Sequence, residues 1–309
     1  MGHFIENFAA INKGLGLYYG CRFVLLPRLL FRITKNNLYF NKVVNDFIHH
    51  HFDNCLHRYS DYHIKQMQLK TIDTIWVFWW QGIDSMPPVI KECYHSLLRN
   101  SNDYHVVLIT KDNISDYLTL PDYILQKFNE KKINFPHFSD IVRVLLLNLY
   151  GGLWIDAAIF VTRPIDIGNV LFFSPKMRNM GSQAPHLCKW VIGVMASQPN
   201  NPIFLYMQDV LFSYWKKFDA PFHYLMFDYM LRYGYENAAL FKDIIDAVPV
   251  SSPDIHSSRY TFGKEVDYSH LDYLLENNQF LSLTYRIDYP LKTVDGKETY
   301  YSALLNKCK

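Results

Sequence analysis

The sequence has 309 residues, of which 50% are hydrophobic and 17% aromatic; this is enough apolar material for a large core and excludes a disordered chain. The formal net charge of +2 at pH 7 predicts no strong attraction to nucleic acid. The charge is unevenly spread, however. Residues 1–70 carry nine Lys or Arg and four Asp or Glu, so the front of the chain is positive while the rest is slightly negative.

The N-terminal region combines basic and apolar residues. Between Glu6 and Asp46 every charged residue is Lys or Arg, and leucines and aromatic residues lie between them. The most apolar stretch, residues 14–33, contains three arginines and Pro27, which argues against a membrane-spanning helix. Two interpretations stay open for residues 14–42: a peripheral element in the headgroup layer of an anionic membrane, or a helical pair packed on the main domain.

The overall organisation follows from this contrast. We expect residues 1–70 to form a basic helical extension and residues 71–309 a catalytic domain. The five cysteines are scattered without metal-ligand or redox spacing, and no secretory signal is evident at the start. These features predict a reduced, cytoplasmic protein, and the extension would place it at the inner face of the cell membrane.

From residue 71 onward, apolar runs typical of strands alternate with helical patterns. The expected strands are residues 71–80, 104–110, 153–161 and 190–197, and the expected helices are residues 89–100, 111–118, 120–132, 139–149, 202–217 and 222–233. Such alternation implies right-handed crossovers, and so predicts an α/β fold with a mostly parallel sheet and flanking helices. In these sheets ligands bind at the carboxyl ends of the strands.

The stretch "SDIVRVLLLNLYGGLWIDAAIF", residues 139–160, contains the strongest local signals. Ser139 is a suitable N-cap, and Asp140 and Arg143 are three positions apart on one helix face, where they can pair. The other helix positions are almost all apolar, so the helix is expected to be buried and the pair to point into a cleft. Gly151 is expected to end the helix in the left-handed conformation, and Gly152 to permit a tight entry into the strand.

Asp156 is the only carboxylate in the apolar run that follows. Burying a lone carboxylate costs several kcal/mol unless it is paired, so Asp156 needs an explanation. One interpretation is structural: Asp156 caps a neighbouring helix or pairs with Arg143. The other is a ligand site, for which the small residues Ala157 and Ala158 leave room. A single carboxylate at the open end of a sheet suits Mg²⁺ or Mn²⁺ whose shell is completed by substrate phosphates.

Three segments carry a resemblance to a known family. "IWVFWWQGIDSMPPVIKECYHSLLRN", "FSDIVRVLLLNLYGGLWIDAAIFVTRPI" and "PFHYLMFDYML" resemble the bacterial capsular polysaccharide synthesis glycosyltransferases, which are related to yeast mannosyltransferases and the glucosylating clostridial toxins. The resemblance covers roughly residues 71–290. It implies a GT-A fold and a retaining hexosyltransferase. The donor would be a nucleotide-diphosphate sugar, and the acceptor an oligosaccharide, most naturally lipid-linked, in capsule or other surface polysaccharide synthesis.

The resemblance also implies roles for individual residues. Asp140 and Arg143 match a pair that holds the donor sugar and a neighbouring phosphate, and Gly151 and Gly152 match the family's turn. Asp156 matches the first carboxylate of the family's DxD metal motif. The sequence departs from the motif at its second carboxylate, where it has Ala158. Chelation of a divalent cation by two carboxylates is therefore lost, and the need for Mn²⁺ or Mg²⁺ is in doubt.

Further candidate residues lie outside this stretch. Trp80, Gln81 and Gly82 follow the first strand, where the family's fold stacks the nucleotide base; the alternative for the tryptophan is an ordinary core position. Asp228 matches an aspartate on a helix beside the sugar pocket, or else is simply a buried, paired group. Arg286 could neutralise the leaving diphosphate, although a surface arginine is an equally good interpretation.

Two other functions stay open at this stage. The missing carboxylate at Ala158 also fits a catalytically inactive relative that only binds or docks within the capsule machinery. A sugar-phosphate transferase is the third possibility, and it would release a nucleoside monophosphate instead of a diphosphate.

Overall fold

The computed structural model describes residues 2–29, 38–59, 69–178 and 184–308 of the chain. Its strands are β1 (Thr74–Phe78), β2 (His105–Ile109), β3 (Gly152–Ile155), β4 (Ile159–Val161), β5 (Phe172–Phe173), β6 (Val194–Ser197) and β7 (Phe280–Ser282). Its helices and helical turns are α1 (Gly2–Leu15), α2 (Leu17–Gly20), the π-helical η1 (Cys21–Leu25), α4 (Leu38–His57), the 3-10 turn η3 (Ile83–Ser85), α5 (Pro88–Asn100), α6 (Ile114–Tyr117), α7 (Asp122–Asn129), α8 (Phe135–Leu149), α9 (Pro202–Lys217), α10 (Met226–Asn237), α11 (Ala239–Asp246), α12 (Ser258–Thr261), α13 (Tyr268–Asn277) and α14 (Tyr300–Lys307).

The main sheet has five strands in the order β2-β1-β3-β6-β5. Strand β1 is parallel to both of its neighbours, and Ile75 is in register with Val106 on one side and Leu153 on the other. Strand β6 runs antiparallel to β3 and to β5, so it is the one reversed strand of this sheet. The expected α/β fold with a mostly parallel sheet, flanking helices and a helical N-terminal region is confirmed.

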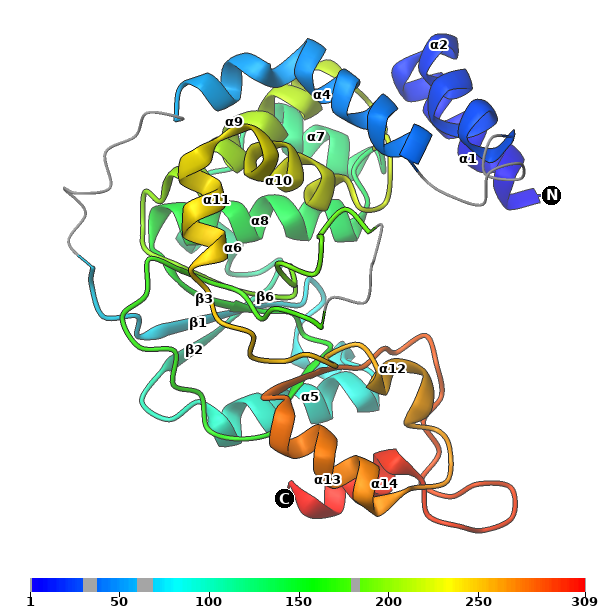
Figure 1. Ribbon diagram of the computed structural model, residues 1–309, viewed down its shortest axis with the longest axis vertical. Helices are drawn as coiled ribbons and strands as arrows, with labels where there is room; N and C mark the ends of the chain where they lie inside the picture. The colour runs from blue at the N-terminus through cyan, green and yellow to red at the C-terminus, as the bar shows by residue number, and fades with distance from the viewer. Residues whose placement is uncertain (1, 30–37, 60–68, 179–183, 309) are drawn as a thin grey trace.

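Helices cover the sheet on both faces (Figure 1). Above it lie α8, α9 and α10, and below it lies α5. The core between the sheet and these upper helices is dense in buried aromatic side chains, among them Trp154, Trp190, Trp215, Tyr206 and Tyr214, none of which is exposed. Burying a large apolar side chain contributes roughly 1.5–3 kcal/mol, so this layer supplies much of the stability that holds the carboxyl ends of the strands in place.

The C-terminal part of the chain forms a lobe below the main sheet (Figure 1). Here β4 and β7 make a two-stranded antiparallel sheet, in which Phe160 is in register with Leu281. These two side chains share a separate small core with Phe262 and with residues of α13 and α14. The lobe therefore has its own packing, and β4 connects it directly to the end of β3.

The N-terminal helices pack against the upper layer. The apolar face of α4 buries Val44, Phe47 and Phe52 in the same core as α9 and α10. Helix α1 approaches the body so closely that the backbone N–H of Asp219 donates to the carbonyl of Gly14 at 3.2 Å. For the described residues, the packed helical arrangement is therefore the observed one. Residues 30–37, which belong to the membrane-surface expectation for 14–42, lie outside the described part.

The strand expected over residues 153–161 is wrong, because the chain turns at Asp156. Strand β3 ends at Ile155, and the backbone N–H of Asp156 donates to the carbonyl of Gly193 at 2.8 Å. The N–H of Ile159 then donates to the carbonyl of Asp156 at 2.9 Å, which closes a turn before β4 begins in the other sheet. Asp156 therefore lies just beyond the carboxyl end of a strand rather than in its middle.

Helix α8 also begins earlier than expected. Its N-cap is Asn134 rather than Ser139, and the Asn134 side-chain oxygen accepts a hydrogen bond from the backbone N–H of His137 at 3.1 Å. Pro136 occupies the first turn, where its missing N–H is no disadvantage. Asp140 thus lies in the second turn, away from the helix end, and its charge needs a side-chain partner.

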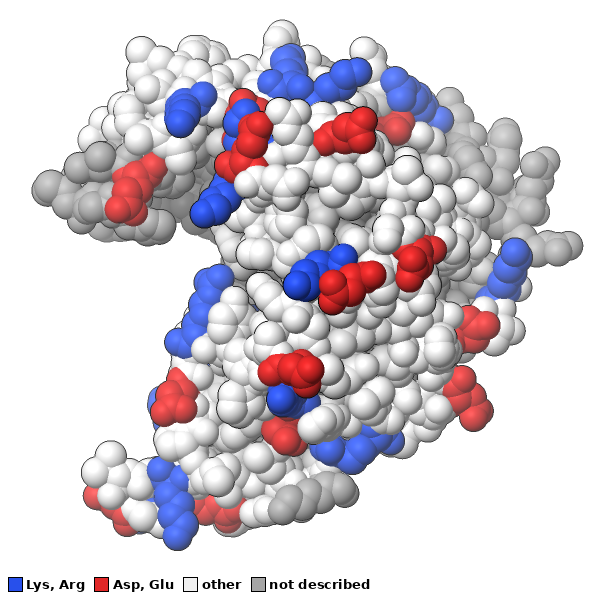
Figure 2. All heavy atoms as spheres, turned by 180° about the vertical axis from the view of Figure 1, so that it is seen from behind, with Lys and Arg blue, Asp and Glu red and all other residues white. Residues whose placement is uncertain are grey.

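The face opposite to that of Figure 1 is notched between the helices at its upper end and the lobe at its lower end (Figure 2). Lys and Arg side chains are scattered among Asp and Glu side chains over this face, so no single sign of charge dominates it.

Candidate active site

A cavity of about 810 Å³ lies at the carboxyl ends of β1 and β3. One wall is formed by the segment that follows β1, by the first three turns of α8 and by the turn after β3. The opposite wall comes from α12 and from the segment that follows β7. The cavity thus lies where ligands bind in parallel sheets, and its two walls come from different parts of the chain.

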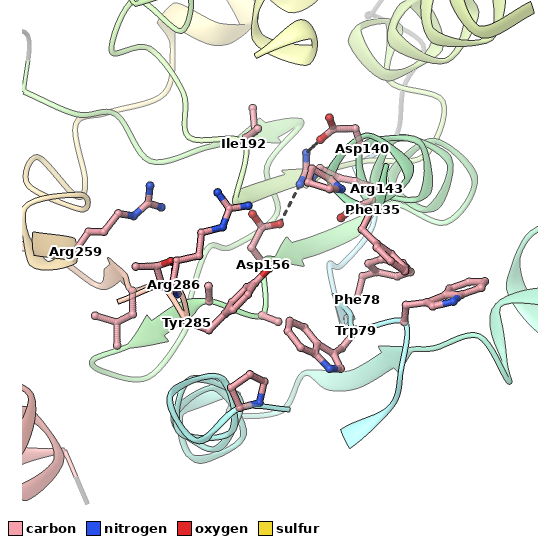
Figure 3. A pocket seen from close by; sticks show the side chains of 18 of the residues that line it. Phe78, Trp79, Phe135, Asp140, Arg143, Asp156, Ile192, Arg259, Tyr285 and Arg286 are labelled. Carbon is pink, nitrogen blue, oxygen red and sulfur yellow. Dashed lines mark hydrogen bonds and ion pairs between the residues drawn. The ribbon is translucent and has the colours of Figure 1, made fainter. Parts of the chain in front are cut away.

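A buried ion-pair chain runs along the first wall (Figure 3). Arg143 is only 2% exposed, and its Nη1 donates to Asp140 Oδ1 at 2.7 Å. Its Nη2 donates to Asp156 Oδ1 at 2.9 Å. Both interpretations offered for Asp156 therefore have support: it pairs with Arg143, and with 38% of its side chain exposed it also faces the cavity.

The surroundings of Arg143 keep its guanidinium protonated and fix its position. Burial by itself lowers the pKa of Arg143, but the attraction of Asp156 and Asp140 outweighs this effect and raises that pKa above its ordinary value. The guanidinium also lies 4.9 Å from the ring centre of Trp154 and 5.4 Å from that of Phe227. Such cation–π contacts are strongest in desolvated sites, so the arginine is held by aromatic rings as well as by carboxylates.

Two residues fix the carboxylate of Asp156. Trp154 Nε1 donates to Asp156 Oδ1 at 2.7 Å, so this oxygen accepts from both an arginine and an indole. Gly193 lies against the other oxygen: a Cβ at this position would come within 3.0 Å of Asp156 Oδ2. The glycine therefore provides the space that lets Oδ2 face the cavity, where no residue of the described chain donates a hydrogen bond to it.

Asp228 lies behind this wall rather than in it. It is buried on α10, does not line the cavity, and accepts a hydrogen bond from Trp190 Nε1 at 2.9 Å. Burial raises the pKa of Asp228 to about 7; the Trp190 hydrogen bond opposes this rise, whereas the negative charge of Asp140 adds to it. The structure thus places Asp228 on a helix behind the cavity wall, as a buried group that is bonded to Trp190 and influenced by the charge of Asp140.

The second wall carries two arginines. Arg286 is exposed and lines the cavity from the segment after β7. Arg259, on α12, lines it as well, and its Nη2 donates to Ser282 Oγ at 2.7 Å. The only hydrogen bond found for Arg286 among the described residues is the one from its backbone N–H to Thr284 Oγ1, at 3.2 Å.

Aromatic side chains surround the cavity mouth. Tyr224, Tyr260 and Tyr285 all line it and are exposed, Tyr260 by 72%. Trp79 lies edge-on to Tyr285, with 5.9 Å between the ring centres. Exposed aromatic faces with a polar end suit ligands that present both apolar and hydrogen-bonding surfaces, as sugars do.

The structure brings together six of the expected site residues. Trp80, Gln81, Asp140, Arg143, Asp156 and Arg286 line the cavity. Trp80 is also packed edge-on against Phe128 and Phe138, so it is partly the core residue that the alternative interpretation allowed. Gly82 does not line the cavity, although it lies next to Gln81, which does.

Gly151 and Gly152 lie at the amino end of β3, opposite the cavity, and a donor-binding role finds no support there. Both have positive φ, at 70° and 102°, as the turn requires. A Cβ on Gly151 would come within 2.7 Å of the Ser197 carbonyl, and one on Gly152 within 2.7 Å of Trp76 Nε1. Their role is the tight α8–β3 connection.

The donor atoms present do not fit a divalent cation held by the protein alone. Asp156 Oδ1 already accepts two hydrogen bonds, one from the positive Arg143, and Ala158 occupies the position of a second carboxylate. In the described part of the chain, no group of three or more His, Cys, Asp or Glu side chains is arranged to hold a metal ion.

Several site residues are missing from the sequence-based expectations. Trp154 could have been found, because it lies two positions before Asp156 in the expected strand, where both side chains would point to the same side. Gly193 carries a weaker signal, an isolated glycine in an apolar strand-like run, which often marks a close approach. Tyr224 lies in the stretch expected as a helix over 222–233, but the helix begins only at Met226. Arg259 and Tyr260 lie in a segment without clear periodicity, and no local pattern points to them.

The fold and the cavity define an α/β protein with a large cavity at the carboxyl ends of parallel strands. More narrowly, the chain belongs to the family described as capsular polysaccharide synthesis protein, whose model matches residues 30–304. The resemblance drawn from the motifs is thus confirmed. The match also begins well before residue 71, so α4 is part of the matched region.

Two relatives and one solved structure to which the chain is similar are named as glycosyltransferases. The O-glycosyltransferase braB of Annulohypoxylon truncatum is 33% identical over 102 residues, which are 30% of this chain and 24% of that protein. An uncharacterized glycosyltransferase of Acanthamoeba polyphaga mimivirus is 24% identical over 135 residues, 42% of this chain and 51% of that protein. The chain therefore spans about a quarter of the length of the first relative and about half of the second. Among solved structures, the PaToxG glycosyltransferase is similar with a TM-score of 0.41 and 16% identity, over 67% of this chain and 83% of that one.

Proposed function

We propose that this protein is a glycosyltransferase of the GT-A class that moves a hexosyl group from a nucleotide-diphosphate sugar to an oligosaccharide acceptor in capsular or other surface polysaccharide synthesis. The observation that carries the proposal is the chain Asp140–Arg143–Asp156, which presents one carboxylate oxygen to a large cavity at the carboxyl ends of parallel strands. Family membership and the glycosyltransferase names of the relatives support the same conclusion.

In this proposal the first wall positions the donor sugar. Asp156 Oδ2 accepts a hydrogen bond from a sugar hydroxyl, while Arg143 and Trp154 hold the carboxylate in one orientation. Asp140 acts through Arg143 and is a positioning residue, as is the buried Asp228 behind it. Orientation of this kind contributes several kcal/mol, because it removes the entropy loss from the reaction step.

Transfer proceeds with retention of configuration. The acceptor hydroxyl oxygen bonds to the anomeric carbon on the face from which the diphosphate oxygen departs, and that departing oxygen takes the acceptor proton. No separate general base is then needed. The negative charge that develops on the diphosphate is the charge that the site most needs to stabilise, and the arginines of the second wall, which line the same cavity, would do so. No step of this proposal passes through a metal ion.

The test is donor turnover without acceptor. The protein is incubated with a panel of nucleotide-diphosphate sugars, and the release of free sugar, nucleoside diphosphate and nucleoside monophosphate is measured. Slow release of sugar and diphosphate from one donor supports the proposal. Release of monophosphate would show a sugar-phosphate transferase instead. Donor binding without any turnover, even with oligosaccharide acceptors, would show a binding or docking relative.

We further propose that the N-terminal helices attach the protein to an anionic membrane surface, where a lipid-linked acceptor is available. Four leucines on and after α2 are exposed, and the basic Arg22 and Arg28 lie between them: Leu17, Leu25, Leu26 and Leu29. Such a surface gains both apolar burial and attraction to acidic lipids. In the described residues no helix is long and apolar enough to cross a membrane.

Vesicle sedimentation tests this attachment. Purified protein is expected to sediment with vesicles that contain phosphatidylserine and much less with neutral phosphatidylcholine vesicles, because part of the attraction is coulombic. Combining Leu17→Ser with Leu29→Ser should weaken the binding about tenfold or more. Leu291→Ser, which changes an equally exposed leucine in the C-terminal lobe, is the matched control and should bind normally. Equal sedimentation with both vesicle types would contradict the proposal.

A further inference from the structure

We propose that Arg259 and Arg286 together form the diphosphate site of the donor, so that the protein binds the diphosphate without a divalent cation. This inference rests on the proposed function and assigns the ligand chemistry of the second cavity wall. Neither the family description nor the names of the relatives assigns a role to these two residues.

Arg286 has the exposure and freedom expected of a ligand-binding arginine. It lines the cavity, and among the described residues its guanidinium has neither a hydrogen bond nor an ion pair. Figure 3 shows this guanidinium directed toward the carboxylate of Asp156. An arginine whose only role is to keep the surface soluble would be expected to extend into solvent rather than into a cavity.

Arg259 is held in position by the fold but is only partly satisfied. It is half-buried on α12, and its hydrogen bond to Ser282 Oγ ties it to the end of β7. Its Nε is buried without a partner, and no hydrogen bond is found for its Nη1 in the described part of the chain. The side chain is therefore oriented before any ligand arrives, while Nη1 stays available as a donor.

The charge balance of the cavity favours an anion. The charged residues that line it are Asp140, Arg143, Asp156, Arg259 and Arg286. The first wall, in which Arg143 pairs with both carboxylates, sums to −1, and the second wall, with two arginines, sums to +2, so the lining of the cavity carries a net charge of +1. Guanidinium groups are weakly hydrated, permanently charged and shaped to give paired hydrogen bonds to phosphate oxygens. A diphosphate, with two adjacent anionic groups, matches two such arginines.

The first wall is poorly suited to bring in a cation. The free oxygen of Asp156 belongs to a carboxylate that already contacts a positive guanidinium at 2.9 Å, and this charge repels a divalent ion. Ala158 supplies no ligand. In the family, the DxD motif holds a metal ion that stabilises the negative charge of the diphosphate. In this protein the two arginines across the cavity take over that stabilisation.

Binding of inorganic pyrophosphate, measured by calorimetry, tests the site independently of the unknown base and sugar. With EDTA present, the parent protein should bind pyrophosphate. Arg286→Gln and Arg259→Gln should each weaken this binding about tenfold or more, and Arg286→Lys should restore part of the loss. The control is Arg99→Gln, which changes an exposed arginine at the end of α5 and should bind like the parent. Because Arg286 is exposed, its variants test the site even if Arg259→Gln fails to fold.

Each other outcome contradicts a specific claim. If pyrophosphate and the turned-over donor bind only with Mn²⁺ or Mg²⁺, the arginine site is wrong but the proposed function stands. Unchanged pyrophosphate binding in both Gln variants would likewise overturn the arginine site. If the protein neither binds nor turns over any nucleotide-diphosphate sugar, with or without metal, the proposed function is wrong and this inference fails with it.

Discussion

The two walls of the cavity use arginine in opposite ways. Arg143 is buried between two carboxylates and two aromatic rings, so its charge is fully compensated within the protein. Arg286 on the facing wall is exposed and has no ion pair in the described chain, and the charge of Arg259 is likewise not paired with a carboxylate there. A compensated arginine can only support the site, whereas an uncompensated one is available to a ligand.

The walls also differ in how they are built. The first wall stands on α8 and β3, whose buried side chains are packed into the main core. The second comes from the C-terminal lobe, where a four-residue helix and an irregular segment carry the functional side chains. Changes in the first wall should therefore affect stability and activity together, and changes in the second wall should affect ligand binding with little effect on stability.

Replacing Arg143 by Ala should give the largest effect. It leaves Asp140 buried without its partner, and removing one member of a buried pair costs roughly 3–5 kcal/mol. Arg286→Ala, on the facing wall, is the matched comparison and should change the free energy of unfolding by less than about 0.5 kcal/mol. Urea denaturation of the two variants measures the difference. Similar stabilities would mean that Arg143 is not compensated as the structure indicates.

Asp156→Asn should mainly affect activity. The variant keeps an oxygen that can accept from Trp154 Nε1 but loses the charge, and Arg143 retains Asp140 as a partner. We expect donor turnover to fall about a hundredfold, which corresponds to roughly 2.7 kcal/mol of barrier. The melting temperature should fall much less than in Arg143→Ala. More than a tenth of the parental rate would rule out a direct role of the carboxylate.

How far the sequence predicts these two walls depends on the range of the interactions. The helix expected at 202–217 agrees with α9, because its apolar pattern and the start at Asn201-Pro202 are local signals. The Asp140–Arg143 pair was likewise predictable from its i,i+3 spacing. Its extension to Asp156 was offered only as one alternative, because it depends on a turn that the apolar run did not reveal.

The second wall was mostly beyond prediction. Arg259 is positioned by Ser282, which is 23 residues further along the chain, and nothing in either segment indicates that they meet. The expected start of helix α8 at Ser139 is a different kind of error, since Asn134 followed by Pro136 is a recognisable helix start that local reading could have found. Local propensity was enough for the scaffold, but the lobe that closes the cavity is specified by contacts between distant segments.

The pH dependence of the folding stability should reveal the protonation of Asp228, which lies behind the first wall. The pKa of Asp228 is raised to about 7, so the protonated form is favoured in the folded state. The stability that this provides is fully present below the unfolded pKa of about 4 and is lost as the pH rises toward 7. Asp228→Asn imitates the neutral form, and it should gain about 2 kcal/mol relative to the parent between pH 5 and pH 8. Melting temperatures of both proteins over this range measure the effect; a constant difference would show that Asp228 keeps one protonation state.

The smallest expected effect is at Tyr260, on the open side of the second wall. Its exposed ring lines the cavity mouth, where the acceptor must enter after the donor has bound. Stacking on one aromatic face contributes about 0.5–1.5 kcal/mol, so Tyr260→Ala should raise the KM for an oligosaccharide acceptor roughly threefold to tenfold. Acceptor-free donor hydrolysis and the melting temperature should stay near the parental values, because the ring takes part in neither donor positioning nor the core. Tyr268→Ala, at an exposed tyrosine of α13 outside the cavity, is the control. Equal changes in hydrolysis and in transfer would place Tyr260 with the donor rather than the acceptor.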